Sequence, residues 1–442
     1  MSITHENGND LNTYYANNPP SDPPCEDCDD TIWWGLTPYD WRETLNYFFK
    51  MLVLPGAIAA VIILLMILTT GSIDNLTLWT IIIVLTYIGS ILIALYARHR
   101  LLTWIHRIQD ENSLIIPDPL NQINNTTYKI GFVGDIMRMR IYGLQFSNEV
   151  INFFSGVDII VGNLEGIIRP DDPPMTKQSH PATILQQLNG LLRGGTNWLL
   201  CLSNNHSIDF GNREFHRSLN DIQQEPRIDV FGRYDVSHVY VRGQNINISC
   251  ATEWSNQRRW DCISRFPDSM NSSHIDTRLN ILYPHWNYEN ERYVRRWLQN
   301  RANDLLTSNV GKRWDLIFGH HPHVRQPVIY VHDTNDNVNK LVAFSGGNFT
   351  SGVRFFRLKK HIHGIIMRCD IGPLTQNPAR LGIGKVEIQN TYNKKGRDPI
   401  TGDRIKTVVF GEGIQGISRF WILIIGIVII TTVVLLRVFG IF

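Results

Sequence analysis

The sequence predicts an α/β (α+β) domain of layered sheets with flanking helices, joined to three transmembrane helices. Two observations predict this fold class. Between residues 128 and 390, short apolar runs alternate with polar loops and with two stretches of helical periodicity. Outside that region, three uncharged runs rich in Leu, Ile and Val have roughly the 17 to 25 residues that a helix needs to cross a bilayer. They are residues 51–73, 75–97 and 420–436.

Composition excludes several classes of protein. The 442 residues are 43% hydrophobic and 19% charged, which is too apolar for a disordered or collagen-like chain. The net charge is +2 and there is no long basic block, so we expect no nucleic-acid partner. Six cysteines are too few for a disulfide scaffold. Cys25 and Cys28 form a single CxxC among acidic residues, which favours a solvated tail over a zinc site.

The chain is predicted to have five parts. They are a flexible acidic tail (1–45), a transmembrane helical hairpin (46–98), the main α/β domain (127–392), a linker (393–416) and a C-terminal transmembrane helix (417–442). The tail is rich in Pro and like charges, which cannot bury enough apolar area to fold. The loop between the first two spans is too short to hold a domain, so the tail and the main domain share one compartment.

The charges that flank the spans predict the orientation of this multi-pass protein in the cell membrane. Arg98, Arg100 and Arg107 follow the second span, whereas the loop between the spans carries only Asp74. Because Arg and Lys accumulate on the cytoplasmic side, we expect the main domain in the cytoplasm. Four Asn-x-Ser/Thr patterns in the main domain would suit an external domain, so the opposite orientation stays open.

Six short apolar runs in the main domain are typical of buried strands, and each ends in a cluster of polar residues. The runs are residues 130–133, 157–161, 198–202, 279–283, 316–318 and 341–344. In α/β folds the functional crevice forms at the carboxyl ends of strands, so these clusters are expected to face one site. Helices are expected at residues 213–223 and 289–306, where the apolar residues are spaced as on one helix face.

The strand-end clusters contain side chains that can bind metal ions. They include the carboxylates Asp135 and Glu165, the amide Asn205 and the imidazole pair His321 and His323. Each alone is compatible with a cap or a turn. Together, oxygen and nitrogen donors without thiolate suit Mn, Fe or Zn. Since a carboxylate can bridge two cations, we expect two divalent ions and hydrolysis of a phosphoester.

Six motifs of the main domain resemble the CapA/PgsA family. The motifs are GDIM (134–137), GNLEG (162–166), SNNHSIDFG (203–211), HWNYE (285–289), GHHPHVRQP (319–327) and SGGNF (345–349). The members of this family are poly-γ-glutamate capsule synthesis proteins with the fold of calcineurin-like metallophosphoesterases. The resemblance covers the main domain in the family's order of motifs. It implies a layered β-sandwich flanked by helices.

The resemblance also implies roles for individual residues. The implied metal ligands are Asp135 and His323 for the first ion, Glu165 as the bridge, and Asn205, His285 and His321 for the second ion. His206 is the implied catalytic residue, and Asp209 would orient it. Met137 stands where related enzymes have a histidine, which leaves the first ion one ligand short.

Three further residues are candidates for binding substrate. Arg138 follows Asp135 closely, and Arg325 lies two residues beyond His323. A guanidinium near metal ions can hold a phosphate or a carboxylate of an anionic polymer, although a solvated arginine is equally compatible with the sequence. Asn348, in the last motif, is the third candidate.

Two functions stay open on the sequence. The first is a membrane-anchored, metal-dependent phosphoesterase-like hydrolase of capsule, poly-γ-glutamate or other envelope polymer biosynthesis, acting on an anionic polymer or a phosphoester. The second is a non-catalytic subunit that assembles or guides the membrane subunits of a polymer synthesis or export complex. A transporter is disfavoured, because the three apolar runs contain no ionisable residue that would mark a pathway.

Overall fold

The computed structural model describes most of the predicted main domain. The described residues are 3–4, 102–170, 177–241, 243, 245–257, 262–266, 279–307, 314–352 and 361–412. The chain divides into two compact units, one of Met1–Gly35 with Ile108–Gly413 and one of Leu36–Arg107 with Ile414–Phe442. The three predicted spans lie outside the described residues. Within the described ranges, no helix has both the length and the apolar character needed to cross a bilayer.

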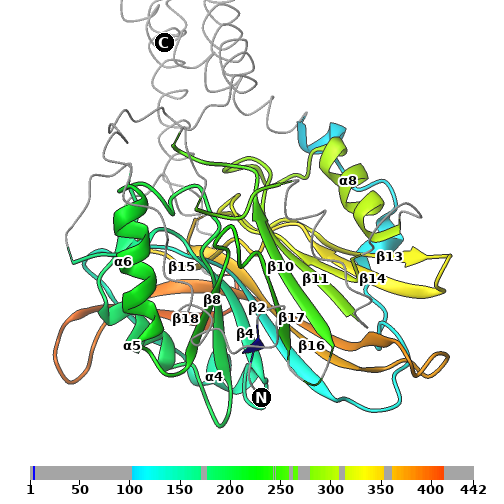
Figure 1. Cartoon of the computed structure of the whole chain (residues 1–442), viewed down its shortest axis with the longest axis horizontal. Coiled ribbons are helices and arrows are strands. Elements are labelled where there is room, and N and C mark those ends of the chain that lie inside the picture. The colour runs from blue at the N-terminus through cyan, green and yellow to red at the C-terminus, as the bar shows by residue number, and fades with distance from the viewer. Residues whose placement is uncertain are drawn as a thin grey trace, which may run out of the picture. The chain divides into compact units, whose positions relative to one another are not determined.

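The larger of the two main sheets runs in the order β3-β18-β17-β16-β2-β4-β7-β8, and β15 pairs with β2 (Figure 1). Its strands are β2 (Tyr128–Ile136), β3 (Gly143–Phe146), β4 (Ile159–Leu164), β7 (Asn197–Cys201), β8 (Ile228–Phe231), β15 (Asn348–Thr350), β16 (His363–Pro373), β17 (Leu381–Arg397) and β18 (Arg404–Phe410). The strands β2, β4, β7 and β8 are parallel, so their carboxyl ends reach the same edge.

The smaller main sheet runs in the order β1-β9-β10-β11-β12-β14-β13. Its strands are β1 (Ile3–Thr4), β9 (His238–Val241), β10 (Ile246–Thr252), β11 (Leu279–His285), β12 (Leu316–Phe318), β13 (Val328–Asp333) and β14 (Val338–Ala343). Here β10, β11, β12 and β14 are parallel. The short strands β5 (Ile167–Ile168) and β6 (Ser179–His180) pair separately.

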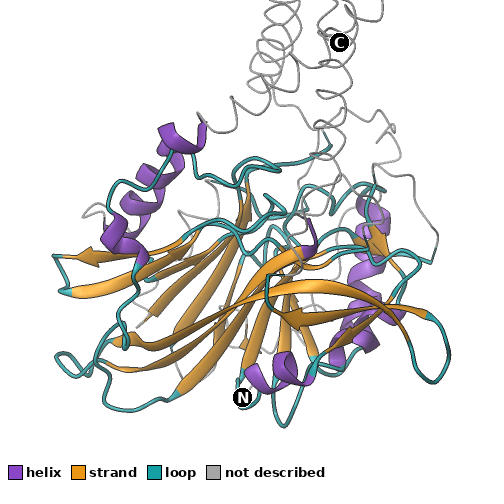
Figure 2. Cartoon of the chain, turned by 180° about the vertical axis from the view of Figure 1, so that it is seen from behind, coloured by secondary structure: helices purple, strands orange, loops and turns teal. Residues whose placement is uncertain are grey.

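The helices lie at the periphery of the sheets (Figure 2). They are η1 (Glu111–Leu114), α4 (Asn148–Phe153), α5 (Thr183–Asn189), α6 (Asn212–Gln223) and α8 (Arg296–Thr307). In α6 the buried residues Phe215, Leu219 and Ile222 are spaced as on one helix face, and the helix predicted at residues 213–223 is confirmed.

The two main sheets pack face to face around an aromatic core. Phe132 of β2 stacks on Phe318 of β12 with the ring centroids 5.4 Å apart. The Tyr283 hydroxyl of β11 donates a hydrogen bond of 2.5 Å to the carbonyl of Val133. The predicted α/β class of layered sheets and helices is therefore confirmed, and the six predicted strands all form.

The second predicted helix starts later than its pattern indicated. Helix α8 begins at Arg296, whereas the sequence predicted a helix from residue 289. The Gln326 side chain donates hydrogen bonds to the carbonyls of Glu291 and Tyr293, and those carbonyls are then not available for the first helical turn. Asn290 moreover has a φ of 70°, which no α-helix accommodates.

Two segments outside the predicted main domain take part in the sheets. The predicted linker contains the end of β17 and all of β18, which is hydrogen-bonded between β17 and β3. The sequence pattern did not predict β18, because charged residues alternate with apolar ones at its start. Ile405 and Val408 are nevertheless buried. Ile3 and Thr4 of the predicted tail pair with β9. The main domain thus includes strands from both sides of the predicted boundaries.

A buried lysine provides a test of the packing at β14. The ammonium of Lys340, of which 1% is exposed, lies 2.9 Å from the buried Asp333 carboxylate and donates to the carbonyl of Leu306. We expect Lys340→Met to lower the free energy of unfolding by about 3–5 kcal/mol, because Asp333 loses its buried cation. Lys385→Met is the control, since the Lys385 pair with Glu387 lies at the surface. Chemical denaturation measures both, and equal losses in the two variants would contradict the packing.

Candidate metal centre

The predicted site residues lie where the parallel strands of both main sheets end. Asp135 is near the carboxyl end of β2, and Glu165 directly follows β4. Asn205 lies four residues after the end of β7. From the other sheet, His285 ends β11 and the segment 320–323 follows β12. Because the sheets face each other, these two sets of strand ends meet at one edge of the sandwich.

Two glycines allow the strand ends to approach closely. A Cβ atom on Gly134 would lie 2.0 Å from the carbonyl oxygen of Gly347, whose loop is hydrogen-bonded to the backbone of Asp135. A Cβ atom on Gly319 would lie 2.2 Å from the indole nitrogen of Trp286. Any larger residue at either position would push apart the segments that carry the site.

The backbone of the histidine loop after β12 is held in an unusual conformation. His321 has a φ of 98° and His323 a φ of 57°, in a region that non-glycine residues rarely adopt. One oxygen of Asp135 accepts hydrogen bonds from the His321 backbone N–H (3.2 Å) and from the His323 Nδ1 (3.1 Å). The carboxylate of the first sheet therefore fixes the loop of the second.

Asn163 joins the two carboxylates. Its side-chain amide donates to Asp135 at 2.8 Å and to Glu165 at 3.1 Å. Asn204 in turn donates to the Asn163 oxygen at 3.1 Å. This chain of amides holds both carboxylates in place from behind, and the sequence analysis did not identify it. All four side chains are fully buried.

Among the described residues, two buried groups have their donor atoms within 4.8 Å of one another. The first, called the Asp135 group, is Asp135, His285 and His320; the second, called the Glu165 group, is Glu165, His321 and His323. His323 also connects the groups, because its Nδ1 contacts Asp135 and its Nε2 lies 3.5 Å from Glu165. The structure thus brings together all six predicted ligands, with Asn205 beside His285.

His320 is a member of the site that the sequence analysis missed. Its Nδ1 lies 2.8 Å from the Nδ1 of His285 and 3.5 Å from Asp135. The Nε2 of His285 lies 3.0 Å from the Asn205 oxygen. The contact of its Nδ1 with His320 holds the ring of His285 so that Nε2 faces Asn205, where a metal ion would bind between the two side chains. The only signal in the sequence was the adjacency of His320 to the predicted pair.

Burial and neighbouring charges drive the two carboxylates apart in pKa. Burial alone would raise the pKa of Asp135, but hydrogen bonds from His320 and His323, and their charges, hold it well below its usual range. Burial raises the pKa of Glu165 well above its usual range, and the nearby Asp135 adds to this. Without a metal ion, the site therefore favours one ionised and one protonated carboxyl group.

The pKa values of the imidazoles also diverge, one being raised and two being lowered. Burial would lower the pKa of His323, but the charges of Glu165 and Asp135 raise it to about 10. Burial, together with the neighbouring imidazoles, holds the pKa of His285 and of His321 well below the usual range. His285 and His321 are thus neutral, as metal ligands must be, whereas Glu165 and His323 carry protons that a metal ion would displace.

Unpartnered polar atoms at the site provide the test of whether a metal ion fits. The Oε1 atom of Glu165 and the Nδ1 atom of His321 are buried without a hydrogen-bond partner among the described residues. Such atoms are rare in folded proteins, because desolvating them costs about 1–3 kcal/mol each. Both belong to the Glu165 group, and a divalent cation would satisfy them. The donor set of carboxylate, amide and imidazole fits Mn, Fe or Zn.

His206 and Asp209 form a pair at the margin of this site. The Nδ1 of His206 donates to the Asp209 carboxylate at 2.5 Å, and Asn256 donates to the other Asp209 oxygen at 3.3 Å. The charge of His206 also reaches His321, where it contributes to the lowered pKa. The Nε2 of His206 is therefore directed away from Asp209 by a fixed ring, as a positioned proton donor requires.

The predicted substrate residues are placed differently from one another. Asn348 accepts a hydrogen bond of 3.1 Å from His323, so it belongs to the metal centre. Arg138 is buried three residues after Asp135, and its charge contributes to the lowered pKa of His180, which results mainly from burial. The Arg325 guanidinium makes a two-point ion pair with Glu412 instead of joining the cluster.

An aromatic side chain covers the metal centre on one side. The ring of Trp254 stacks on His321 with centroids 5.7 Å apart and lies 5.2 Å from the ring of Tyr288. The guanidinium of Arg295 lies over the ring of Tyr288, 3.6 Å from its centroid. Trp254 could not be predicted as part of the site, since an aromatic residue in a polar loop carries no specific signal.

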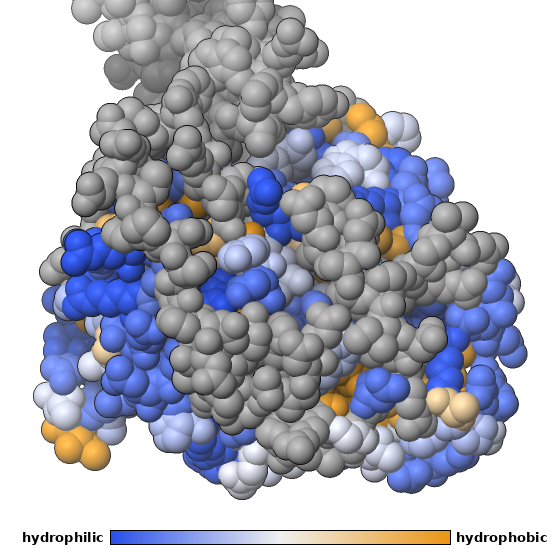
Figure 3. Space-filling view, in the orientation of Figure 1, coloured by the Kyte–Doolittle hydropathy of each residue, from blue (hydrophilic) through white to orange (hydrophobic). Residues whose placement is uncertain are grey.

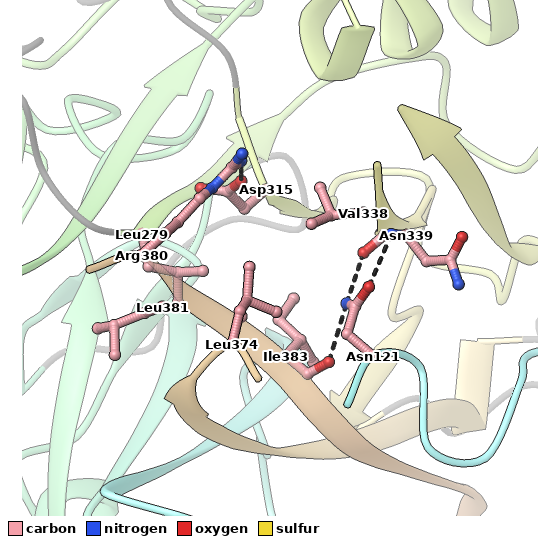
Figure 4. A pocket seen from close by; sticks show the side chains of 10 residues that line it. Asn121, Leu279, Asp315, Val338, Asn339, Leu374, Arg380, Leu381 and Ile383 are labelled. Atoms are coloured by element: carbon pink, nitrogen blue, oxygen red, sulfur yellow. Dashed lines mark hydrogen bonds and ion pairs between the residues drawn. The ribbon is translucent and has the colours of Figure 1, made fainter. Parts of the chain in front are cut away.

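A second hollow lies at the opposite ends of β11 and β12. It is lined by residues that include Leu279, Asp315 and Arg380 (Figure 4). Arg380 makes an ion pair of 2.8 Å with Asp315, and Asn121 bonds the backbone of Asn339. The polar groups of this hollow thus bind one another.

Comparison with known proteins identifies the family of the chain. A family model described as bacterial capsule synthesis protein PGA_cap matches residues 129–353, or 225 of the 442 residues. Neither a curated protein nor a solved structure matched the chain. The matched stretch contains every predicted metal ligand from Asp135 to His323, the candidate substrate residues Arg138, Arg325 and Asn348, and both members of the His206–Asp209 pair. The chain belongs to the family of bacterial capsule synthesis proteins.

Proposed function

We propose that this protein is a membrane-anchored, metal-dependent hydrolase of phosphoesters that acts in capsule polymer synthesis. The family match supports a function in capsule synthesis. The observation that carries the proposed activity is the pair of buried donor groups, with unpartnered atoms on Glu165 and His321, beside the His206–Asp209 pair. A bound divalent cation would satisfy both of these buried atoms.

The side chains have complementary tasks in this proposal. Divalent ions bound by the two groups would neutralise phosphoryl oxygens and acidify a water molecule. Asn163 and Asn204 hold the carboxylates in position, and His320 fixes the ring of His285. His206, oriented by Asp209, would transfer its Nε2 proton to the leaving oxygen. Trp254 would limit access of water to the ring of His321.

A second candidate function is that of a non-catalytic subunit that assembles a polymer synthesis complex. One feature favours it: Met137 stands where the resemblance implies a metal-binding histidine. In the structure the Met137 N–H donates to the Thr350 carbonyl, and the Met137 carbonyl accepts from the Thr350 hydroxyl. A thioether binds hard divalent ions poorly. This function requires the fold and at most one ion, and it predicts no turnover.

Membrane attachment is part of the proposal and derives from the sequence. The uncharged runs at residues 51–73 and 75–97 are long enough to span a bilayer, and the run at 420–436 is marginally so. The arginines after the second run support a cytoplasmic main domain.

We expect the affinity for Mn²⁺ to rise with pH. Because the pKa of His323 is raised to about 10 in the metal-free protein, its ring carries a proton at neutral pH and must lose it to bind a metal ion. Titration calorimetry between about pH 6 and pH 9 measures this, and proton release appears as a dependence of the heat on the buffer. An affinity that is constant over this range would show that metal binding displaces no proton.

We expect Mn²⁺-loaded protein to hydrolyse an aryl phosphate ester, and His206→Ala to lower kcat by roughly a hundredfold to ten-thousandfold. The reason is that the leaving oxygen loses its proton donor. The variant should retain the bound metal, which elemental analysis measures. His332→Ala, at an exposed imidazole of β13, is the matched control. Metal-loaded wild type without turnover would favour the assembly function.

We expect a cysteine introduced by Ser72→Cys to react with an impermeant thiol reagent on intact cells. The background is Cys25→Ser with Cys28→Ser, because the described cysteines at 201, 250, 262 and 369 are buried. The matched control is the Cys28→Ser variant, in which Ser72 is unchanged and Cys25 is the cysteine tested. It should not react, since the tail that carries Cys25 shares the compartment of the main domain. The reverse pattern of labelling would place the main domain outside.

A further inference from the structure

The loop after β10 is a third source of side chains at the metal centre. β10 ends at Thr252, whose hydroxyl accepts from the Trp254 N–H and donates to the Trp254 carbonyl. The Glu253 N–H donates to the carbonyl of His285, so this turn is attached to the end of β11. Asn256 follows the turn, and none of the six sequence motifs contains it.

The backbone of Asn256 is attached to the segment that carries Asn205. Its N–H donates to the Asn205 carbonyl at 3.2 Å. The segment after β10 of one main sheet thereby meets the segment after β7 of the other. Partial exposure of a polar side chain would not by itself single out Asn256, because the described surface in Figure 3 is largely hydrophilic. The partners of its side chain distinguish it.

The Asn256 side chain bridges a predicted metal ligand and the predicted proton donor. Its Oδ1 accepts a hydrogen bond of 3.4 Å from the Asn205 amide, and its Nδ2 donates one of 3.3 Å to Oδ1 of Asp209. The same Nδ2 lies 3.1 Å from Nδ1 of His206. Because that Nδ1 donates to Asp209, the hydrogen bond of Asn256 is the one to the carboxylate. One amide therefore bonds both parts of the site.

The Asp209 carboxylate sets the direction of this chain of amides. A carboxylate offers only acceptors, so the NH₂ group of Asn256 must face it and the Asn256 oxygen must face Asn205. The NH₂ group of Asn205 then faces Asn256. Its oxygen is directed the other way, where it lies 3.0 Å from Nε2 of His285. This is the place where a metal ion would bind between Asn205 and His285.

Asn256 also holds the carboxylate that orients His206. Oδ2 of Asp209 accepts from His206 at 2.5 Å and from the Gln178 N–H at 2.9 Å, whereas Oδ1 accepts from Asn256. Asp209 is only 3% exposed, so water has little access to replace a lost donor. Without Asn256, Oδ1 would lose this partner, and the carboxylate would be less firmly held against the ring of His206.

We propose that Asn256 is a positioning residue that directs the Asn205 amide at the metal ion and holds the His206–Asp209 pair toward the leaving oxygen. The effect on the metal ion requires no substrate, whereas the effect on the leaving oxygen rests on the proposed function. Side chains that bond a metal ligand typically change metal affinity or activity by about 10- to 100-fold when they are removed.

The first test measures Mn²⁺ binding to the full detergent-solubilised chain by titration calorimetry, without substrate. We expect Asn256→Ala to weaken the affinity about tenfold or more, because the Asn205 oxygen is no longer directed at the ion. In the background of Asn205→Ala it should cause no further loss, since its effect passes through that ligand. Gln257→Ala is the matched control, because it removes the amide of the next residue in the same loop.

The second test compares the hydrolysis of two esters at saturating Mn²⁺. Phenyl phosphate needs a proton on its leaving oxygen, whereas dinitrophenyl phosphate releases a stable anion and needs none. We expect Asn256→Ala to lower kcat about tenfold or more on phenyl phosphate and less than about twofold on dinitrophenyl phosphate. A merely structural defect would lower both rates alike.

Asn256→Asp keeps the size of the side chain and separates its two contacts. The new side chain can still accept from Asn205, so we expect Mn²⁺ to bind at least as tightly as in wild type. It has no NH₂ group to donate to Asp209, and two adjacent carboxylates repel each other. We therefore expect this variant to lose rate on phenyl phosphate as Asn256→Ala does.

Three results would overturn the proposal. One is an Mn²⁺ affinity of Asn256→Ala equal to that of wild type. Another is an equal fall of kcat on the two esters. The third is an equal loss of affinity in Asn256→Ala and Gln257→Ala, which would indicate a general disturbance of the loop. Wild type that binds Mn²⁺ but hydrolyses neither ester would contradict the proposed function, and the Mn²⁺ affinities would still decide on the role of Asn256 at Asn205.

Discussion

The burial of two carboxylates side by side is the constraint on which the rest of the structure depends. Asp135 and Glu165 are both fully buried and are joined by Asn163. An ionised carboxylate without a partner cannot remain in the interior, because its desolvation costs several kcal/mol. Imidazoles must therefore surround the pair, and they come from the other sheet. The carboxylates of one sheet and the imidazoles of the other can balance each other only where the strands of both sheets end at the same edge.

The same requirement explains the local irregularities of the backbone. His321 and His323 have positive φ values, and Asp135 compensates for their strain with hydrogen bonds to both residues. Gly134 and Gly319 occupy points where no Cβ atom fits. Each irregularity brings a donor closer to the carboxylates. The strained loop and the buried charges thus stabilise each other, and neither would persist alone.

Much of this was predictable from the sequence, for a physical reason. Buried parallel strands are short and apolar, and the chemistry of an α/β fold gathers at their ends, so Asp135, Glu165 and the histidines could be placed at one edge. His320 was missed because its role depends on the direction of a ring that adjacency does not determine. The late start of α8 depends on Gln326, which lies thirty residues farther along the chain than the first turn. Contacts between distant segments leave no periodic signal.

The charge state of the site links the unusual Met137 to the rest of the centre. Without a metal ion, one proton neutralises Glu165 and a second makes His323 the cation that balances the ionised Asp135, as the raised pKa values of Glu165 and His323 indicate. A metal ion would replace these protons. The side chain of Met137 adds no metal ligand. Its backbone hydrogen bonds with Thr350 hold β15 in place, and Asn348 of the same strand accepts a hydrogen bond from His323. The backbone of Met137 therefore supports β15 and, through Asn348, the position of His323.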